Sequence, residues 1–256
     1  MQNYVISLKK SSQRRTHIED QFGKQGVKFD FFDALTPEPA IRLANKMFLN
    51  IENGILGGRE LACFMSHVAI WQKVVDENIP YVAIFEDDVY LGENATYFLN
   101  TSDWIHEDWH IIKIEAFAKK LWLSQQQFHI QGSDRCLRYL IGDNLGTAGY
   151  ILSLTGAKTY LDYVSKNPLT PLDEMMFYKF NRKNKKKVLQ MFPSLCIQEM
   201  NLYPESQVAL SSELIEERKG RMKKFKKKGI HKIQHEIRRI YEHFMKFIYA
   251  VENKFK

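Results

Sequence analysis

The sequence lacks any long apolar run. Within its 256 residues, no stretch approaches the roughly 18 consecutive apolar residues that a bilayer-spanning helix needs. Residues 1–5 also lack the charged segment followed by an apolar segment that begins a secretory signal peptide. We therefore expect a protein that is neither exported nor membrane-spanning.

Cysteine is also scarce. Cys63, Cys136 and Cys196 are odd in number, widely spaced and outside any metal-ligand pattern. Such cysteines are typical of reduced thiols in a cytosolic protein. The hydrophobic fraction of 45% and the charged fraction of 26% are those of a globular chain, which predicts one main domain with an appendage.

Positive charge is concentrated at the end of the chain. The net charge is +7, but residues 218–256 hold 14 Lys and Arg against three Glu and so carry +11 by themselves. The preceding body is therefore acidic. Because no nucleic-acid-binding fold accompanies the basic segment, nucleic acid ranks last among its partners.

The most informative stretch is residues 82–89, with the sequence VAIFEDDV. Its apolar half predicts a buried strand that Glu86, Asp87 and Asp88 end. Side chains alternate along a strand, so Glu86 and Asp88 should share one side and Asp87 should face the other. We interpret the cluster as an oxygen-ligand site for Mg²⁺ or Mn²⁺ at the carboxyl end of a strand, where open α/β sheets bind ligands. The alternative is an acidic turn in water.

Alternating strands and helices predict a parallel or mixed α/β sheet. The expected strands include 4–8, 28–34, 82–85, 109–114 and 188–192, the expected helices include 12–22 and 59–76, and residues 40–58 are expected to be irregular. The first strand leads through a basic turn into a helix. Such a turn can hold a nucleotide diphosphate, although exposed surface charge is the more frequent explanation of such a pattern.

Three further segments carry candidate polar residues. His67 lies on the apolar face of the helix at 59–76, where a packed core histidine is the favoured interpretation. Gly146 and Thr147 precede an apolar strand, and small residues there allow a ligand to approach the backbone. A proline-bounded loop delivers Asp173 and Glu174 to the first turn of a helix, where they act as capping residues or as a general base.

The basic end of the chain has helical periodicity. Apolar residues recur at spacings of three and four from Ile230 to Phe255 among many lysines and arginines. This pattern predicts a basic amphipathic helix lying on an anionic membrane. Packing onto the protein's own body, or onto a second copy in a homodimer, is the alternative.

Taken together, several segments resemble glycosyltransferase family 25, the lipooligosaccharide galactosyltransferases of Gram-negative bacteria. The matching segments are residues 5–8 with Arg14 and Arg15, 59–71, 85–89, 146–153 and 171–173, in the family's order. The resemblance implies an α/β fold of GT-A type over residues 1–205, with a mixed, mostly parallel sheet flanked by helices. Residues 206–256 lie outside it as a basic amphipathic helical extension.

The resemblance also implies roles for individual residues. The metal, Mn²⁺ or Mg²⁺, would be held by Asp88 and Glu86 as a variant of the Asp-x-Asp motif. The donor would be bound by Ser7, Leu8, Arg14, Ser66, His67, Asp87, Gly146 and Thr147. Asp173 would be the general base, with Glu174 and Asp143 as alternatives.

The implied reaction moves galactose from UDP-galactose to a sugar hydroxyl of a lipooligosaccharide or lipopolysaccharide core. The family's β-galactosyltransferases invert the sugar, and a β-1,4 linkage is our leading hypothesis. The partners would be a UDP-sugar, a lipid-linked oligosaccharide and the anionic inner-membrane surface, which predicts a cytoplasmic protein peripheral to the inner face of that membrane. The alternatives are another UDP-hexose, a protein acceptor, or a non-catalytic membrane- or partner-binding module.

Overall fold

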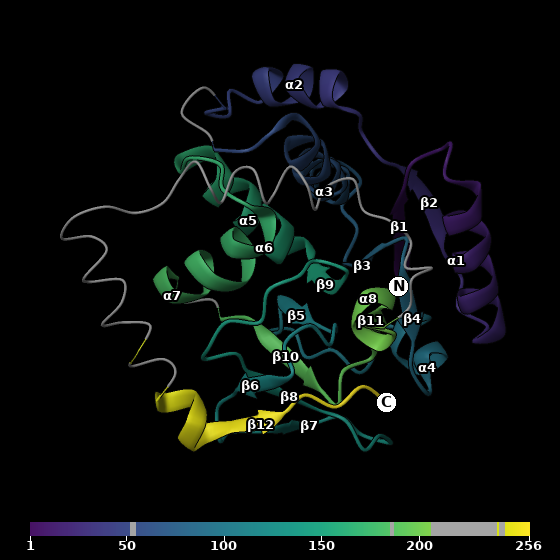
Figure 1. The fold of residues 1–256 in the computed structure, drawn as a ribbon, viewed down its shortest axis with the longest axis vertical. Helices are drawn as coiled ribbons and strands as arrows, with labels where there is room; N and C mark the ends of the chain where they lie inside the picture. Colours follow the sequence, from purple (N-terminus) through teal and green to yellow (C-terminus); the bar gives the residue numbers. More distant parts are fainter. Residues whose placement is uncertain (52–54, 185–186, 206–239, 241–243) are drawn as a thin grey trace.

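A mixed sheet forms the centre of the computed structural model, which describes residues 1–256 except 52–54, 185–186, 206–239 and 241–243 (Figure 1). The sheet has eight strands in the order β2-β1-β3-β9-β5-β10-β8-β7. These strands are β1 Gln2–Ser7, β2 Asp30–Asp33, β3 Tyr81–Glu86, β5 Ile111–Lys113, β7 Phe128–His129, β8 Cys136–Tyr139, β9 Gly149–Ser153 and β10 Leu189–Phe192.

Most strands of this sheet run in one direction. β1 pairs in parallel with β2 and β3, β5 pairs in parallel with β10, and β9 lies antiparallel between β3 and β5. Only β9 and β8 run against the others among the strands that the structure describes. The predicted mixed, mostly parallel sheet is confirmed. Its topology brings the carboxyl ends of β1, β3 and β5 to the same edge as the beginning of β9.

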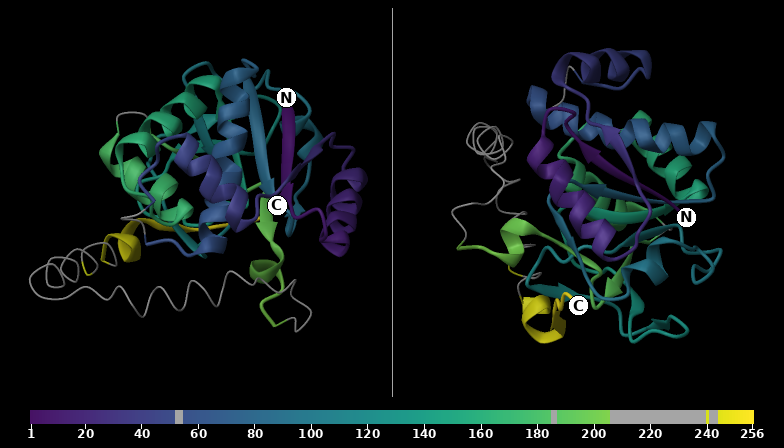
Figure 2. Two further views of the ribbon diagram at one scale, coloured as in Figure 1. Left: turned by 90° about the horizontal axis from the view of Figure 1, so that it is seen from above. Right: turned by 90° about the vertical axis from the view of Figure 1, so that its right-hand side faces the viewer.

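Helices cover both faces of the sheet. They are α1 Ser12–Lys24, α2 Pro37–Lys46, α3 Gly58–Asp76, α4 Ala95–Leu99, α5 Leu154–Lys166, α6 Leu172–Glu174, the π-helix η1 Met175–Phe180, α7 Asn181–Lys183 and α8 Glu199–Leu202. Ile84 packs in the apolar cluster that includes α2, α3 and α5, whereas Phe85 packs in the cluster that includes α1 and α4. The left view of Figure 2 shows the strands between these two helical layers, with α1 in purple on one side.

Helix α3 confirms the predicted helix at 59–76. Its apolar residues recur on one face, and Phe64, Val68 and Trp71 are fully buried. At its start, the Glu60 carboxylate accepts a hydrogen bond from the Gly57 backbone N–H. This satisfies one of the groups that a helix end leaves unpaired.

The irregular segment predicted at 40–58 is wrong over its first part, because α2 runs from Pro37 to Lys46. Proline is well suited to the first turn of a helix, where its missing N–H costs nothing. Ala40 and Ala44 are fully buried against the core, and burial of this face stabilises the helix.

Two small sheets complete the fold. β4 Val89–Leu91 pairs with β11 Cys196–Gln198, and β6 Lys120–Trp122 pairs with β12 Ala250–Glu252, in both cases antiparallel. The first pair fixes the turn after β3 against Gln198. The second attaches the end of the chain to the body.

The predicted helix from Ile230 to Phe255 is wrong over its last residues. Residues 244–249 are helical, but Val251 lies in β12 and Phe255 bridges to Ser194. Backbone pairing with β6 satisfies polar groups that a helix end would leave exposed, and Val251 packs against the larger apolar cluster. Most of the predicted extension, 206–239 and 241–243, lies outside the described residues. In the part of the chain that is described, no helix is long and apolar enough to cross a bilayer.

Candidate functional site

Glu86 is the last residue of β3, and Asp87 and Asp88 lie in the turn that follows. The three carboxylates face two sides, with Glu86 and Asp88 together. Gln198 Nε2 lies 3.3 Å from Glu86 Oε2 and 3.2 Å from Asp88 Oδ1, so one amide group donates to both carboxylates. Asp87 points away from them and accepts a hydrogen bond from Ser7 Oγ at 2.6 Å. We call this region, formed by residues 7, 86–88, 113–115 and 146–148, the carboxylate edge of the sheet.

Burial gives the first pair unusual electrostatics. Desolvation, reinforced by the neighbouring Asp88, raises the pKa of Glu86 from its ordinary value to about 8. Desolvation also raises the pKa of Asp88, although Arg14 opposes it. Two adjacent carboxyl groups that are hard to ionise together form the donor set that a hard divalent cation prefers. The residues present therefore fit Mg²⁺ or Mn²⁺.

Arg14 joins the end of β1 to the same edge. Its guanidinium lies 2.5 Å from Asp87 Oδ1 and 3.9 Å from Asp88 Oδ2. Ser7 ends β1, and the half-buried Leu8 follows it. A guanidinium beside carboxylates at the beginning of a helix can bind a phosphate group. The structure thus brings the predicted donor-binding residues Ser7, Arg14 and Asp87 into one cluster.

His67 approaches the carboxylates from α3. Its side chain is fully buried, and its Nδ1 lies 2.7 Å from the Tyr150 hydroxyl, which also accepts a hydrogen bond from Trp71 Nε1 at 3.0 Å. Burial lowers the pKa of His67 to about 3, so the imidazole is neutral. His67 Nε2 lies 4.0 Å from Glu86 Oε1 and has no hydrogen-bond partner among the described residues.

The adjacent Ser66 has a different environment. Its hydroxyl donates to the Ala62 carbonyl at 2.8 Å and accepts a hydrogen bond from the Leu35 N–H at 2.9 Å. It is fully buried, and these contacts hold the chain that leads into α2. Its predicted contact with a donor stays a prediction.

The loop before β9 contacts the carboxylates directly. Thr147 Oγ1 donates to Glu86 Oε1 at 2.6 Å. Gly146 adopts φ +87°, and a Cβ there would lie 2.5 Å from Glu115 Oε1. Glycine is therefore required at this position both by the backbone conformation and by the close approach.

A buried ion pair that the sequence analysis did not identify supports this loop. Lys113 Nζ lies 2.7 Å from Glu115 Oε2 and donates to the Gly146 carbonyl at 2.6 Å. The same Glu115 oxygen accepts a hydrogen bond from the Ala148 N–H at 3.0 Å. The sequence signal for this pair is Lys113 and Glu115 on either side of Ile114, because residues two apart at the end of a strand face the same side. Gln198 was also missed, because nothing in the local sequence relates it to β3.

The acidic residues predicted as general bases lie in two places. Asp173 is buried in the first turn of α6, and its Oδ1 accepts a hydrogen bond from the half-buried Glu174's N–H. Asp143 instead forms an ion pair with Lys246 in the C-terminal segment.

The ring of Phe177 positions the helical segment that carries Asp173. The centroid of the Phe177 ring lies 6.2 Å from that of the Tyr150 ring and 4.2 Å from Lys113 Nζ. Phe177 thus contacts both Tyr150, which contacts His67, and Lys113, which pairs with Glu115.

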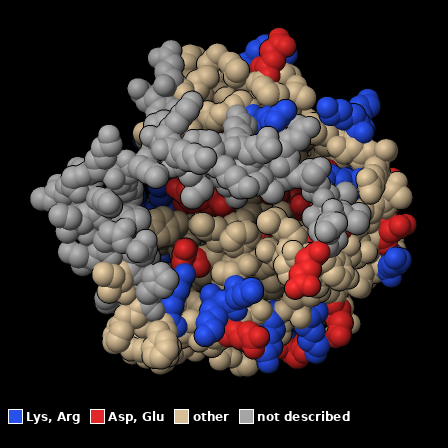
Figure 3. All heavy atoms as spheres, viewed as in Figure 1, with Lys and Arg blue, Asp and Glu red and all other residues tan. Residues whose placement is uncertain are grey.

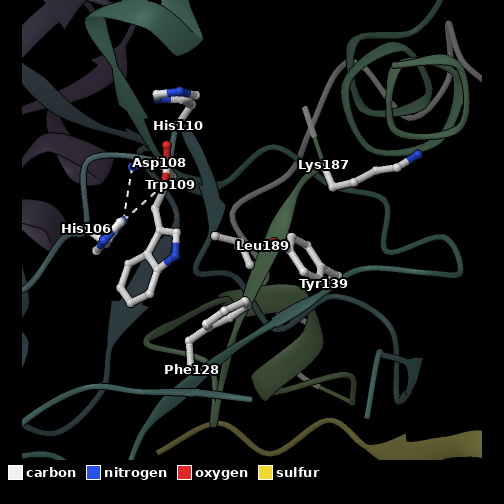
Figure 4. A pocket seen from close by; sticks show the side chains of 8 residues that line it. All are labelled: His106, Asp108, Trp109, His110, Phe128, Tyr139, Lys187 and Leu189. Atoms are coloured by element: carbon white, nitrogen blue, oxygen red, sulfur yellow. Dashed lines mark hydrogen bonds and ion pairs between the residues drawn. The ribbon is translucent and has the colours of Figure 1, made fainter. Parts of the chain in front are cut away.

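A cavity of about 480 Å³ lies at the opposite edge of the sheet, where β5 and β10 begin (Figure 4). We call this the cavity edge. His106, Trp109, Phe128 and Tyr139 are among its lining residues. Within the described residues, none of the predicted site residues lines it. On the face drawn in Figure 3, acidic side chains also reach the surface in a central hollow, while basic and acidic side chains alternate along the lower rim.

Comparisons with known proteins give consistent results. The sequence profile of glycosyltransferase family 25 (LPS biosynthesis protein) matches residues 1–176. The chain is 37% identical over 237 residues to lipooligosaccharide biosynthesis protein lic2B of Haemophilus influenzae, covering 89% of this chain and 87% of that protein. It is 37% identical over 211 residues to lacto-N-neotetraose biosynthesis glycosyltransferase LgtE of Neisseria gonorrhoeae, covering 78% and 75%.

Among solved structures, a glycosyltransferase involved in glycosylation of the major capsid of PBCV-1 superposes with a TM-score of 0.42 at 11% identity. The superposition covers 86% of this chain and 97% of that chain.

Proposed function

The chain belongs to glycosyltransferase family 25, and we propose that it transfers galactose from UDP-galactose to a sugar hydroxyl of a lipooligosaccharide or lipopolysaccharide core. One observation carries this proposal: Glu86 and Asp88 converge at the end of β3, beside Arg14. The names of the relatives support an oligosaccharide acceptor. The mixed sheet with helices on both faces supports a GT-A type fold.

Glu86 and Asp88 would hold the Mn²⁺ or Mg²⁺ ion, because both carboxylates are half-buried and share the Gln198 amide. When bound, the cation supplies Lewis-acid stabilisation of the negative charge on the leaving diphosphate. Arg14 contributes a second positive charge to the same group. Asp87 keeps the Arg14 guanidinium in place through its 2.5 Å ion pair.

Asp173 would take the proton from the acceptor hydroxyl. A hydroxyl is a weak nucleophile, and one carboxylate base suffices for a single displacement that inverts the sugar. Asp173 is preferred to Asp143, because Asp143 is already paired with Lys246. Glu174 remains the neighbouring alternative. Inversion of an α-linked donor sugar gives a β linkage, and its 1,4 position is our specific hypothesis.

The experiment that tests the transferase is turnover of a panel of UDP-sugars with Mn²⁺ and with chelator. We expect hydrolysis or transfer of UDP-galactose that requires the metal and is lost in Asp88→Ala. Asp20→Ala, on the exposed side of α1, is the control and should retain activity. If no UDP-sugar is bound or turned over, the carboxylate edge is not a donor site and a non-catalytic binding module takes its place. Turnover of a different UDP-hexose would change the proposed donor sugar and leave the rest of the proposal intact.

The basic segment would hold the enzyme at the inner face of the inner membrane, where a lipid-linked acceptor is found. Near an anionic surface each Lys or Arg contributes about 1 kcal/mol. Replacing Lys223, Lys224, Lys226, Lys227 and Lys228 by Gln should release the protein from anionic vesicles and leave activity on a soluble acceptor intact. Unchanged vesicle binding would contradict the membrane role. A change of mass in solution would instead indicate a homodimer.

A further inference from the structure

We propose that Cys63, His67 and Glu86 form a second metal site, selective for a borderline-soft divalent cation such as Zn²⁺. The Cys63 thiol, one imidazole nitrogen of His67 and one carboxylate oxygen of Glu86 all lie within 4.8 Å of one another. This ligand set differs from the Glu86 and Asp88 oxygen pair, because a thiol and an imidazole replace one carboxylate. Thiolate and imidazole ligands favour zinc over magnesium or manganese.

The fold brings the three ligands together from two elements. Cys63 and His67 are four residues apart on α3 and therefore lie on one face of the helix, one turn apart. Glu86 ends β3, whose Val82 and Ile84 pack in the same apolar cluster as α3. The approach of helix and strand is thus fixed by core packing, which pre-organises the ligands.

The His67 ring is oriented as in ligating histidines. Its Nδ1 is held by the Tyr150 hydroxyl at 2.7 Å, and a partner of this kind fixes the ring of metal-bound histidines. The opposite nitrogen, Nε2, is fully buried, faces Glu86 Oε1 at 4.0 Å and has no hydrogen-bond partner within the described residues. A buried nitrogen without a partner is costly, and a bound cation would remove that cost.

Charge and size also fit a dication. A Cys63 thiolate and a Glu86 carboxylate carry two negative charges, so a complex with neutral His67 has no net charge and is suited to a partly buried place. Tetrahedral zinc bonds hold ligand atoms roughly 3.3–3.8 Å apart. The Cys63 and Glu86 side chains are half-buried, so they can rotate to bring the ligand atoms, which lie within 4.8 Å of one another, to this separation. Their partial exposure also gives the ion access to the site.

Sharing of Glu86 couples the two sites. Zinc bound to Cys63 and His67 would withdraw Glu86 from the pair with Asp88, and zinc would then inhibit the transferase. This consequence rests on the proposed function, whereas the binding itself does not.

The test is a titration of the metal-free, reduced, full-length protein with Co²⁺, which occupies zinc sites and shows a charge-transfer absorption band when a thiolate binds it. We expect the band in the wild type, its displacement by Zn²⁺, and its loss in Cys63→Ser. Zn²⁺ affinity should fall by more than about 100-fold in His67→Gln. This is more than the 10- to 100-fold loss, roughly, that follows from removing a residue that only hydrogen-bonds to a metal ligand. Cys136→Ser, a buried cysteine in β8, is the matched control and should keep the band.

Asp88→Asn separates the two sites, since it removes an oxygen ligand but none of the three proposed here. We expect it to retain the cobalt band. Absence of the band in the wild type, its persistence in Cys63→Ser, or its loss in Asp88→Asn would each overturn the proposal. Because Cys63 is half-buried, we expect Cys63→Ser to fold. This variant therefore still tests the proposal if His67→Gln does not fold. No sugar nucleotide is used, so the result is independent of whether the enzyme transfers galactose.

Discussion

The two edges of the central sheet hold polar side chains in opposite settings. At the carboxylate edge, the Asp88 side chain is 14% exposed and Glu115 is not exposed at all. At the cavity edge, the Asp108 side chain is 83% exposed and pairs loosely with His106 at 3.6 Å. The cavity edge therefore holds the more exposed charges. Burial of acidic groups is thus the difference between the two edges, and buried acidic groups are typical of functional sites.

The largest expected difference between the edges is catalytic. Asp173→Asn should lower kcat by about 10³-fold, because the acceptor hydroxyl loses its base, while donor affinity stays within about twofold. Asp108→Asn at the cavity edge should leave both values within about twofold. Steady-state kinetics on UDP-galactose and an oligosaccharide acceptor measure this.

Glu174→Gln is the neighbouring control for that prediction. If it loses more activity than Asp173→Asn, the base is Glu174. If Asp108→Asn is the most damaging of the three variants, the comparison of the edges fails.

A pair of glycines tests the packing at the carboxylate edge. Gly146 and Gly132 both have positive φ, but only a Cβ at Gly146 would meet atoms within 3 Å, those of Glu115 and Phe117. Gly146→Ala should cost about 2–4 kcal/mol of unfolding free energy, and Gly132→Ala only about 1 kcal/mol from backbone strain. Urea unfolding compares them, and equal losses would show that the close approach to Glu115 is unimportant.

The pH dependence of stability should reveal Glu86. The folded protein holds the Glu86 proton up to pH about 8, whereas the unfolded chain releases it near the ordinary pKa of 4.5. The folded state thus binds more protons between these values, and its stability falls as pH rises through that window. With chelator present, Glu86→Gln should stabilise the protein by roughly 1–3 kcal/mol at pH 8 and hardly at all near pH 4.5. A pH-independent difference in unfolding free energy would contradict this.

The smallest catalytic effect is expected in the cavity lining. The Trp109 ring lies 5.7 Å from Phe128 and 5.8 Å from His106. Trp109→Ala should lower stability by about 1–2 kcal/mol through these lost ring contacts, and leave kcat/KM within about twofold. A large rise in KM for the acceptor would instead make the cavity edge part of the acceptor site.

Local sequence predicted the elements whose patterns extend over several residues. The apolar face of α3 and the apolar run of β3 were found because each repeats with a single period. Helix α2 was not predicted, because its first turn contains Pro37 and Pro39, and proline is typical of turns as well as of the first turn of a helix. The C-terminal residues were predicted as helix because their spacing is helical, yet pairing of β12 with β6 decides their conformation.

By itself, the sequence determined that three consecutive carboxylates stand at the end of a buried strand, since an apolar run followed by charges predicts one. Glu86 is the last residue of that strand, whereas Asp88 lies in the turn that follows. Only the tertiary structure decided which groups meet them. Gln198 is 110 residues from Asp88, and Thr147 is 61 residues from Glu86. Contacts at such separations depend on strand order and sheet packing, which local periodicity does not specify. The same packing leaves His67 Nε2 facing Glu86, and it created the second ligand set.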